Sequence, residues 1–268
     1  MNFFAHKTVA ERYALYRPYF HPLVIKKTRN RLGIQNLVNR ALDIGCGTGQ
    51  STVALKEIAN SVVGVDISAE MLKLAKQQPG IEYHNASAED LSMFDDGSFD
   101  LITTSMAYHW FDYKRFLLEA HRLLIFDNWL IIYSNGFSGH MTGNPSFKEW
   151  ADQVYTKHYP TSPRNRFTLT PAIAAEFGFA TIHTEDYQNN VQFTPDELSS
   201  YLTTQSNVIS SVEQGDEKIE DVYNWLLSEA KPYFAAEKET LIFCTYGTVP
   251  ANFCATSNHS STCKLPSY

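Results

Sequence analysis

The chain of 268 residues has no apolar run approaching the roughly eighteen residues that a membrane-spanning helix requires. Its first residues, 1–7, also lack the charged segment followed by an apolar segment that is typical of a secretory signal peptide. We therefore expect a cytoplasmic protein that has no membrane partner.

Cysteine is scarce as well. The four cysteines stand at positions 46, 244, 254 and 263, without the paired spacing of a structural metal site. Near the C-terminus, Cys254, His259 and Cys263 offer two thiols and one imidazole in a segment that has no periodicity. We expect reduced thiols, as is usual inside cells, and no metal.

Basic residues are outnumbered, since 22 lysines and arginines face 29 aspartates and glutamates and give a net charge of −7. Residues 26–31 form the one dense basic segment, on an expected helix. Proteins that hold nucleic acid through many phosphate contacts carry a basic surface or stripe. We therefore expect no nucleic-acid partner.

One short segment is more informative than the overall composition. Residues 41–52 read ALDIGCGTGQST, in which an apolar strand end precedes Gly45, Gly47 and Gly49 and the start of an amphipathic helix. A strand, a glycine turn and a helix N-terminus form the place where a parallel α/β sheet receives a nucleotide-like ligand. The dinucleotide fingerprint Gly-x-Gly-x-x-Gly is absent, because Gln50 stands where its last glycine is required. This spacing disfavours an NAD-dependent oxidoreductase, which stays an alternative.

The charges around the glycine turn narrow the kind of ligand. Asp43 lies two residues before the first glycine, where a fixed anion would repel a pyrophosphate and attract an ammonium group. Asp66 ends the next β-branched run, the place from which an acid binds ribose hydroxyls. S-adenosyl-L-methionine carries an ammonium group, a sulfonium, a ribose and no phosphate, and so it fits this pair better than a dinucleotide.

Repeated strand–helix alternation predicts a doubly wound, mostly parallel α/β sheet preceded by N-terminal helices. The expected strands lie at 38–44, 61–66, 81–85, 99–104 and 129–134, and the expected helices at 7–17, 22–32, 49–59, 69–78 and 113–124. The order of the strands cannot be read from this pattern.

The alternation breaks down after the fifth strand. Residues 135–140 are rich in glycine and predict a loop, which opens a cap insertion over about 136–170 with a helix up to His158. A helix at 171–177 and a strand at 180–187 follow, then helices over 195–205 and 216–230 and a last strand at 240–246. We expect a single domain over 1–250 and a poorly ordered tail over 251–268.

A second group of motifs identifies a family. Residues 88–91 (AEDL), 95–100 (DDGSFD) and 107–111 (AYHWF) follow the glycine turn in the order found in the class I S-adenosylmethionine-dependent methyltransferases. The chain resembles their type 11-like members over about residues 8–135, and segment 13–20 is similar to the trans-aconitate methyltransferase-like group. The resemblance implies a Rossmann-like sheet of seven strands and methyl transfer to oxygen or nitrogen of a small molecule.

The resemblance also implies roles for individual residues. The three glycines would let the methionine part of the cofactor lie against the backbone, and Asp43 would orient its ammonium group directly or through water. Ile67 would pack on the adenine, and Ser87, although an acid is common at its position, would define the adenine edge with its neighbours. The expected cofactor-binding residues are Tyr13, Arg17, Asp43, Gly45, Gly47, Gly49, Gln50, Asp66, Ile67, Ser87, Ala88, Glu89, Thr104 and Ser105.

Two further roles follow. His109 is the candidate for catalysis, since an imidazole titrates near neutrality, and packing beside Trp110 is its structural alternative. Arg164 and Arg166 in the cap would recognise an anionic acceptor. A binding module without catalysis and an RNA methyltransferase are two rival functions, and the chain is expected to be a monomer or a homodimer.

Overall fold

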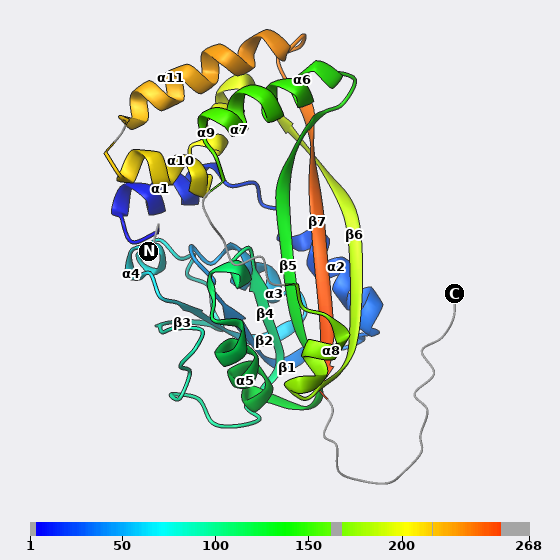
Figure 1. The fold of residues 1–268 in the computed structure, drawn as a ribbon. Helices are drawn as coiled ribbons and strands as arrows, with labels where there is room; N and C mark the ends of the chain where they lie inside the picture. Colours follow the sequence, from blue (N-terminus) through cyan, green and yellow to red (C-terminus); the bar gives the residue numbers. More distant parts are fainter. Residues whose placement is uncertain (1–3, 162–167, 216, 253–268) are drawn as a thin grey trace.

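Seven strands form one mixed sheet in the computed structural model, which describes residues 4–161, 168–215 and 217–252 (Figure 1). The strand order is β3-β2-β1-β4-β5-β7-β6; the first five strands are parallel, and β7 runs antiparallel to both of its neighbours. The strands are β1 (Val38–Ile44), β2 (Ala59–Asp66), β3 (Ile81–Asn85), β4 (Phe99–Ser105), β5 (Leu124–Met141), β6 (Phe179–Phe193) and β7 (Glu239–Asn252). The doubly wound, mostly parallel sheet expected from the sequence is confirmed.

Helices pack against this sheet, and further helices form a cap at one end of its long strands (Figure 1). They are α1 (Lys7–Tyr16), α2 (His21–Leu32), α3 (Gln50–Leu55), α4 (Ala69–Lys73), α5 (Tyr113–Leu123), α6 (Pro145–Trp150), α7 (Thr156–His158), α8 (Pro171–Glu176), α9 (Pro195–Leu202), α10 (Ser206–Glu213) and α11 (Ile219–Ala230). Single turns at Tyr108–Trp110, Ala151–Tyr155 and Lys231–Tyr233 complete the described elements. Among the described helices, none combines the length and the apolar character needed to cross a bilayer.

The central strands form because their side chains are apolar on both faces, as a sheet covered on both sides requires. In β1, Leu42 and Ile44 pack in one hydrophobic core together with α5, whereas Ala41 packs in a second core beneath α2 and α3. Because β1, β4 and β5 run parallel, their carboxyl ends lie at the same edge of the sheet, and the glycine turn begins there.

The loop expected over residues 135–140 is wrong, because these residues continue β5 without a break. Gly136 and Phe137 pair with Cys244 and Phe243 of β7, and a register shift separates Phe137 from His140. The two glycines and the short polar residues suggested a turn, but pairing with a strand about a hundred residues later overrides that local preference.

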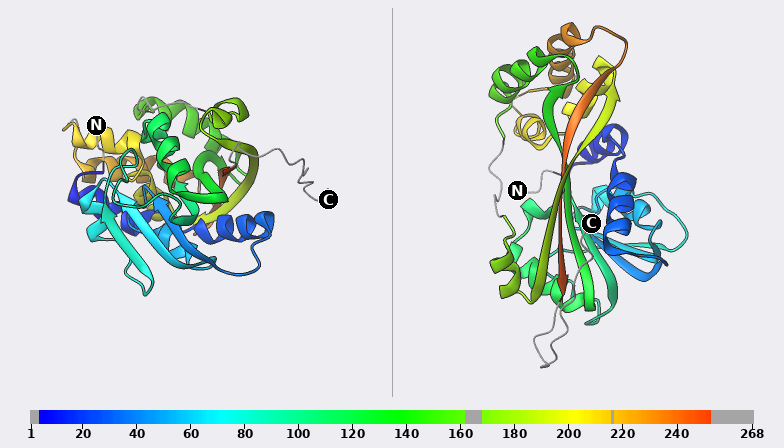
Figure 2. Two further views of the ribbon diagram at one scale, coloured as in Figure 1. Left: turned by 90° about the horizontal axis from the view of Figure 1, so that it is seen from below. Right: turned by 90° about the vertical axis from the view of Figure 1, so that its right-hand side faces the viewer.

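The extension of β5, β7 and β6 carries a cap (Figures 1 and 2). This cap has a hydrophobic core of its own. Its buried side chains come from α6, α9 and α11 and from the upper parts of the three long strands. Trp150, Tyr201 and Phe243 are each no more than 2% exposed there. Strand β7 ends at Asn252, so the first two residues of the expected tail belong to the sheet, and the remainder lies outside the described residues.

A glycine inside β2 tests the packing of the sheet. A Cβ atom on Gly64 would lie 2.7 Å from Cδ1 of Tyr83 and 3.0 Å from Sγ of Cys46, whereas one on Gly136 of β5 would meet only a carbonyl oxygen at 3.9 Å. We expect Gly64→Ala to lower the free energy of unfolding by about 1–3 kcal/mol, measured by urea denaturation. The matched substitution Gly136→Ala should change it by less than about 0.5 kcal/mol. Equal losses in the two variants would contradict this account.

Candidate functional site

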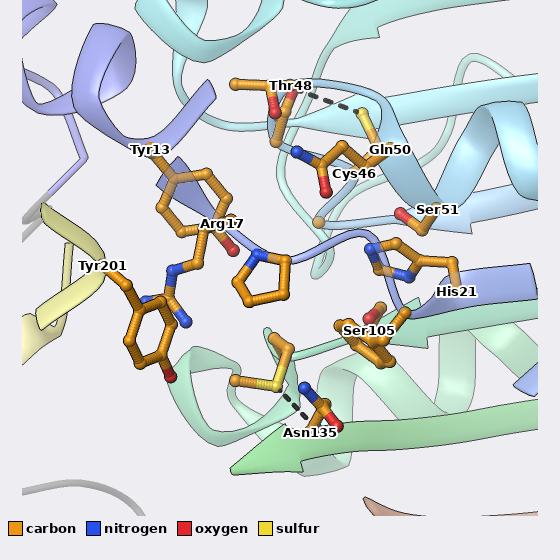
Figure 3. A pocket seen from close by; sticks show the side chains of 15 residues that line it. Tyr13, Arg17, His21, Cys46, Thr48, Gln50, Ser51, Ser105, Asn135 and Tyr201 are labelled. Carbon is orange, nitrogen blue, oxygen red and sulfur yellow. Dashed lines mark hydrogen bonds between the residues drawn. The ribbon is translucent and has the colours of Figure 1, made fainter. Parts of the chain in front are cut away.

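A pocket lies where the glycine turn, the N-terminal helices, the sheet edge and the cap meet (Figure 3). The turn contributes Gly45, Gly47 and Gln50, whereas Met106 directly follows β4 and Asn135 lies within β5. Its other lining residues are Tyr13, Arg17, Pro18, Phe20, His21, Cys46, Thr48, Ser51, Ser105 and Tyr201. Six of the expected cofactor-binding residues thus line one pocket: Tyr13, Arg17, Gly45, Gly47, Gln50 and Ser105.

Asp43 lies behind this pocket, completely buried. Its Oδ2 atom accepts hydrogen bonds from the hydroxyls of Ser51 (2.6 Å) and Thr52 (2.7 Å), and its Oδ1 atom accepts one from Thr103 (3.0 Å). Burial raises the pKa of the Asp43 carboxyl, and the three hydroxyls oppose that shift. The carboxylate therefore joins β1 to the start of α3 and to β4; its expected role toward an ammonium group stays a prediction.

The three glycines of the turn serve different purposes, although all have positive φ. A Cβ atom on Gly45 would lie 2.5 Å from that of Ala107, and one on Gly49 would lie 2.3 Å from the hydroxyl oxygen of Tyr83, so both positions are closed by packing. Gly47, with φ of +53°, has no described atom within 4 Å of such a Cβ. Gly47 is thus the glycine at which a ligand can approach the backbone.

Asp66, at the end of β2, supports the turn from the opposite side. It accepts hydrogen bonds from the backbone N–H of Gly47 (2.8 Å, at Oδ2) and of Ser68 (2.7 Å, at Oδ1). Burial raises the pKa of its carboxyl, while these two donors oppose the rise. Each carboxylate oxygen keeps a second lone pair, which can accept a hydrogen bond from a ligand hydroxyl. The adjacent Ile67 is 63% exposed, an apolar surface suited to a planar ring.

The segment expected at the adenine edge follows β3. The hydroxyl of Ser87 donates to Glu89, whose Oε1 atom accepts from the backbone N–H of Asp112 (2.9 Å), the residue that caps α5. Ala88 is buried in the core. These three residues and Asp66 lie outside the set that lines the pocket, so their contacts with a ligand stay predictions.

Arg17 brings a positive charge into the pocket. Its guanidinium lies 4.6 Å from the ring centre of Tyr13 and 5.4 Å from that of Tyr201, and its Nη2 atom donates to the carbonyl oxygen of Thr204 (2.7 Å). Its Nε atom is buried and finds no partner in the described part of the chain. Among the lining residues no aspartate or glutamate faces it, so the site can accept an anionic group.

Two hydroxyls at the end of β4 are also unsatisfied. Thr104 Oγ1 and Ser105 Oγ are buried and have no hydrogen-bond partner within the described residues. Ser105 lines the pocket, whereas Thr104, the preceding residue of the strand, does not. Because a buried polar atom without a partner is costly, the hydroxyl of Ser105 at the pocket indicates a polar ligand. The described residues contain no cluster of three or more histidine, cysteine or acidic side chains that could hold a metal ion.

His109 lies in the single turn after β4, with its ring 4.7 Å from that of Trp110, and it does not line the pocket. Its catalytic role stays a prediction. Arg164 and Arg166 lie outside the described residues. The pocket also contains residues that the motifs did not indicate, His21, Asn135 and Tyr201, because each comes from a segment brought there by long-range packing.

Comparison with known proteins agrees with this geometry. Residues 42–132 match the sequence model of a family described as a methyltransferase domain. A protein of Dictyostelium discoideum named as a methyltransferase is 37% identical over 119 residues, which cover 44% of this chain and 43% of that protein. A Saccharomyces cerevisiae protein named as S-adenosylmethionine-dependent is 32% identical over 90 residues, or 31% of each chain. The matched region thus spans less than half the length of these curated relatives.

Solved structures share the fold. A methyltransferase from Anaeromyxobacter dehalogenans described as type II has a structure with a TM-score of 0.65 at 21% identity, and the match covers 85% of this chain and 95% of that protein. A phosphoethanolamine N-methyltransferase of Haemonchus contortus, solved with S-adenosylhomocysteine, has a TM-score of 0.53 at 22% identity. That match covers 92% of this chain and 58% of the Haemonchus protein. The Rossmann-like methyltransferase fold implied by the family resemblance is confirmed.

The buried carboxylate of Asp43 is expected to stabilise the fold. Asp43→Ala would leave three buried hydroxyls without their acceptor, and we expect it to lower the free energy of unfolding by about 2–4 kcal/mol. Asp43→Asn keeps one acceptor oxygen and should lose less. Urea denaturation of both variants measures the difference.

A comparison of the wild type with Asp43→Asn also tests the pKa of Asp43. Because burial raises the folded-state pKa, the folded protein holds a proton more readily than the unfolded chain, and the carboxyl stabilises the fold most at low pH. The stability of the wild type relative to Asp43→Asn should therefore fall as the pH rises above about 4. A difference that grows with pH would refute the raised pKa.

Proposed function

Because this chain carries a methyltransferase domain of the S-adenosylmethionine-dependent class I, we propose that it transfers a methyl group to an oxygen or nitrogen of a small molecule. The observation that carries the proposal is the open backbone at Gly47, which faces the same pocket as the uncompensated cation of Arg17 and the unsatisfied hydroxyl of Ser105. When bound, S-adenosylmethionine supplies a methyl group on a positively charged sulfur that is an activated leaving group.

The described residues fit this cofactor group by group. Gly47 leaves space against the backbone, and Arg17 would pair with the carboxylate of the methionine part. Asp66 retains acceptor capacity for ribose hydroxyls, and exposed Ile67 would cover one face of the adenine. Thr104, like Ser105, would border the reacting end.

The protein's own task is to align the reactants and to exclude water, which can supply most of the acceleration for a displacement with an activated leaving group. The N-terminal segment lies against residues that follow β2 and β4: the Ser68 hydroxyl donates to the carbonyl oxygen of Phe4 (2.6 Å), and the Phe4 ring meets the rings of Tyr13 and Trp110. The cap closes the opposite side with Tyr201. These covers favour a small acceptor, as does the excess of acidic residues over basic ones.

Cofactor binding is tested at Gly47 with a matched control. Gly47→Ala places a methyl group where the ligand would approach, so we expect the Kd of S-adenosylhomocysteine to rise by about tenfold or more in calorimetry. Gly97 has a similar φ of +59° and an equally open Cβ position in a turn that does not line the pocket. Gly97→Ala should share the backbone strain, about 1 kcal/mol of stability, and leave the Kd unchanged.

NAD serves as the ligand control for the rival oxidoreductase. S-adenosylhomocysteine should raise the Tm of the wild type, whereas NAD and NADH should not. Stabilisation by NAD but not by S-adenosylhomocysteine would reject the proposed function.

A role of His109 in the reaction is a separate proposal. If its imidazole contacts the acceptor or takes its proton, His109→Gln should lower kcat by about a hundredfold or more and leave the Kd of S-adenosylhomocysteine unchanged. A loss of Tm with unchanged kcat would instead assign His109 to packing beside Trp110. Steady-state kinetics on a panel of phenols, alcohols, amines and small carboxylates provides the measurement.

A further inference from the structure

A second histidine, His21, stands at the pocket itself. It is the first residue of α2, it is 7% exposed, and its ring points into the pocket (Figure 3). A hydrogen bond of 3.0 Å joins its Nδ1 atom to the hydroxyl of Tyr133 on β5. In the described part of the chain, its other ring nitrogen, Nε2, has no hydrogen-bond partner.

The ring of His21 is held in place. The Phe20 ring lies 4.2 Å from it between centroids, and the Tyr133 ring meets it edge-on at 5.9 Å and 77°. Packing and the bond at Nδ1 together leave the imidazole one orientation, in which Nε2 is the atom available to a bound molecule.

The position of Tyr133 shows which half of the pocket His21 serves. Residues two apart on a strand share a face, so Tyr133 and the pocket-lining Asn135 point to the same side of β5. The side-chain amide of Asn189, on β6 beyond β7, donates to Oδ1 of Asn135 (3.1 Å) and orients that amide too. This half of the pocket is thus built from polar side chains that are each oriented by another side chain.

The proposed cofactor residues occupy the other half. Gly47 follows β1 and Asp66 ends β2, whereas β5 lies on the far side of β4 in the strand order. A cofactor over β1 and β2 leaves the region over β4 and β5 for the second reactant.

We propose that His21 binds the methyl acceptor, with Nε2 hydrogen-bonded to the polar group of the acceptor and Tyr133 acting as the positioning residue that fixes the ring. This inference rests on the proposed methyltransferase function. Burial and the nearby Lys76 lower the pKa of His21 to about 3, so the imidazole is neutral at physiological pH and serves as a hydrogen-bonding group.

Substitutions distinguish the roles of the two ring nitrogens of His21. His21→Asn keeps a polar group near the position of Nδ1 and removes Nε2, while Tyr133→Phe keeps the imidazole and removes its anchor. We expect either change to lower kcat/KM for the best acceptor of the panel by about tenfold, which corresponds to one hydrogen bond. The Kd of S-adenosylhomocysteine should stay within about twofold of the wild type, and His21→Gln, which extends an amide toward the position of Nε2, should restore part of the rate.

His140→Asn, at an exposed position of the same strand as Tyr133, is the matched control and should leave both constants unchanged. Unchanged acceptor kinetics in His21→Asn would overturn the proposal, as would an equal loss of S-adenosylhomocysteine affinity. A wild type that binds S-adenosylhomocysteine and methylates no member of the panel would count against the proposed function, not against the placement of His21.

Nitrogen NMR of the histidine-labelled protein tests His21 without an acceptor. In the complex with S-adenosylhomocysteine, the His21 nitrogens should keep the shifts of one neutral tautomer from pH 8 to pH 5, and Tyr133→Phe should move the Nδ1 resonance. Protonation with a midpoint near the ordinary histidine value of about 6.5 would overturn the fixed neutral ring on which the proposal depends.

Discussion

The candidate site depends on a carboxylate that never reaches solvent. An aspartate as deeply buried as Asp43 is tolerated only when its oxygens accept hydrogen bonds. Two of its donors, Ser51 and Thr52, lie in α3 just after the glycine turn, and the third, Thr103, lies opposite Asp43 in the parallel register of β4. The turn is therefore tied at its start, at its end and to the next strand. Its shape is set by the folded core before any ligand arrives, so less ordering remains to be done on binding.

A second constraint is the length of β5, β7 and β6. A parallel sheet alone would expose its carboxyl edge, but these strands continue past that edge and carry the cap helices over it (Figure 1). As a result Arg17, near the N-terminus, donates to the carbonyl of Thr204, 187 residues later. The pocket exists only when the N-terminal helices, the sheet and the cap are all folded, and local unfolding of any one of them would open it.

This arrangement explains what the sequence could and could not predict. The turn at 41–52, the acid that ends β2 and the strand–helix alternation depend on local spacing, and the structure contains them where they were expected. The strand character of residues 135–140 depends on β7, and their glycines gave the opposite local signal. His21 and Tyr201 carried no motif, because their burial in the pocket comes from partners far along the chain. The sequence shows that His21 follows soon after Tyr13 and Arg17, but it does not show that this histidine contacts Tyr133.

The electrostatics of the pocket follow from the same packing. Among the described lining residues Arg17 alone is charged, because burial holds His21 neutral. A protonated imidazole would place a second cation in the same pocket as Arg17, in a region of low effective dielectric, where repulsion is strong. It would also oppose the binding of a ligand that carries a sulfonium. A neutral imidazole supplies hydrogen bonding without that repulsion, and Arg17 keeps its charge for a carboxylate. The burial that places His21 against Tyr133 therefore also keeps its imidazole neutral, so that His21 adds no second cation to a pocket that would hold a sulfonium under the proposed function.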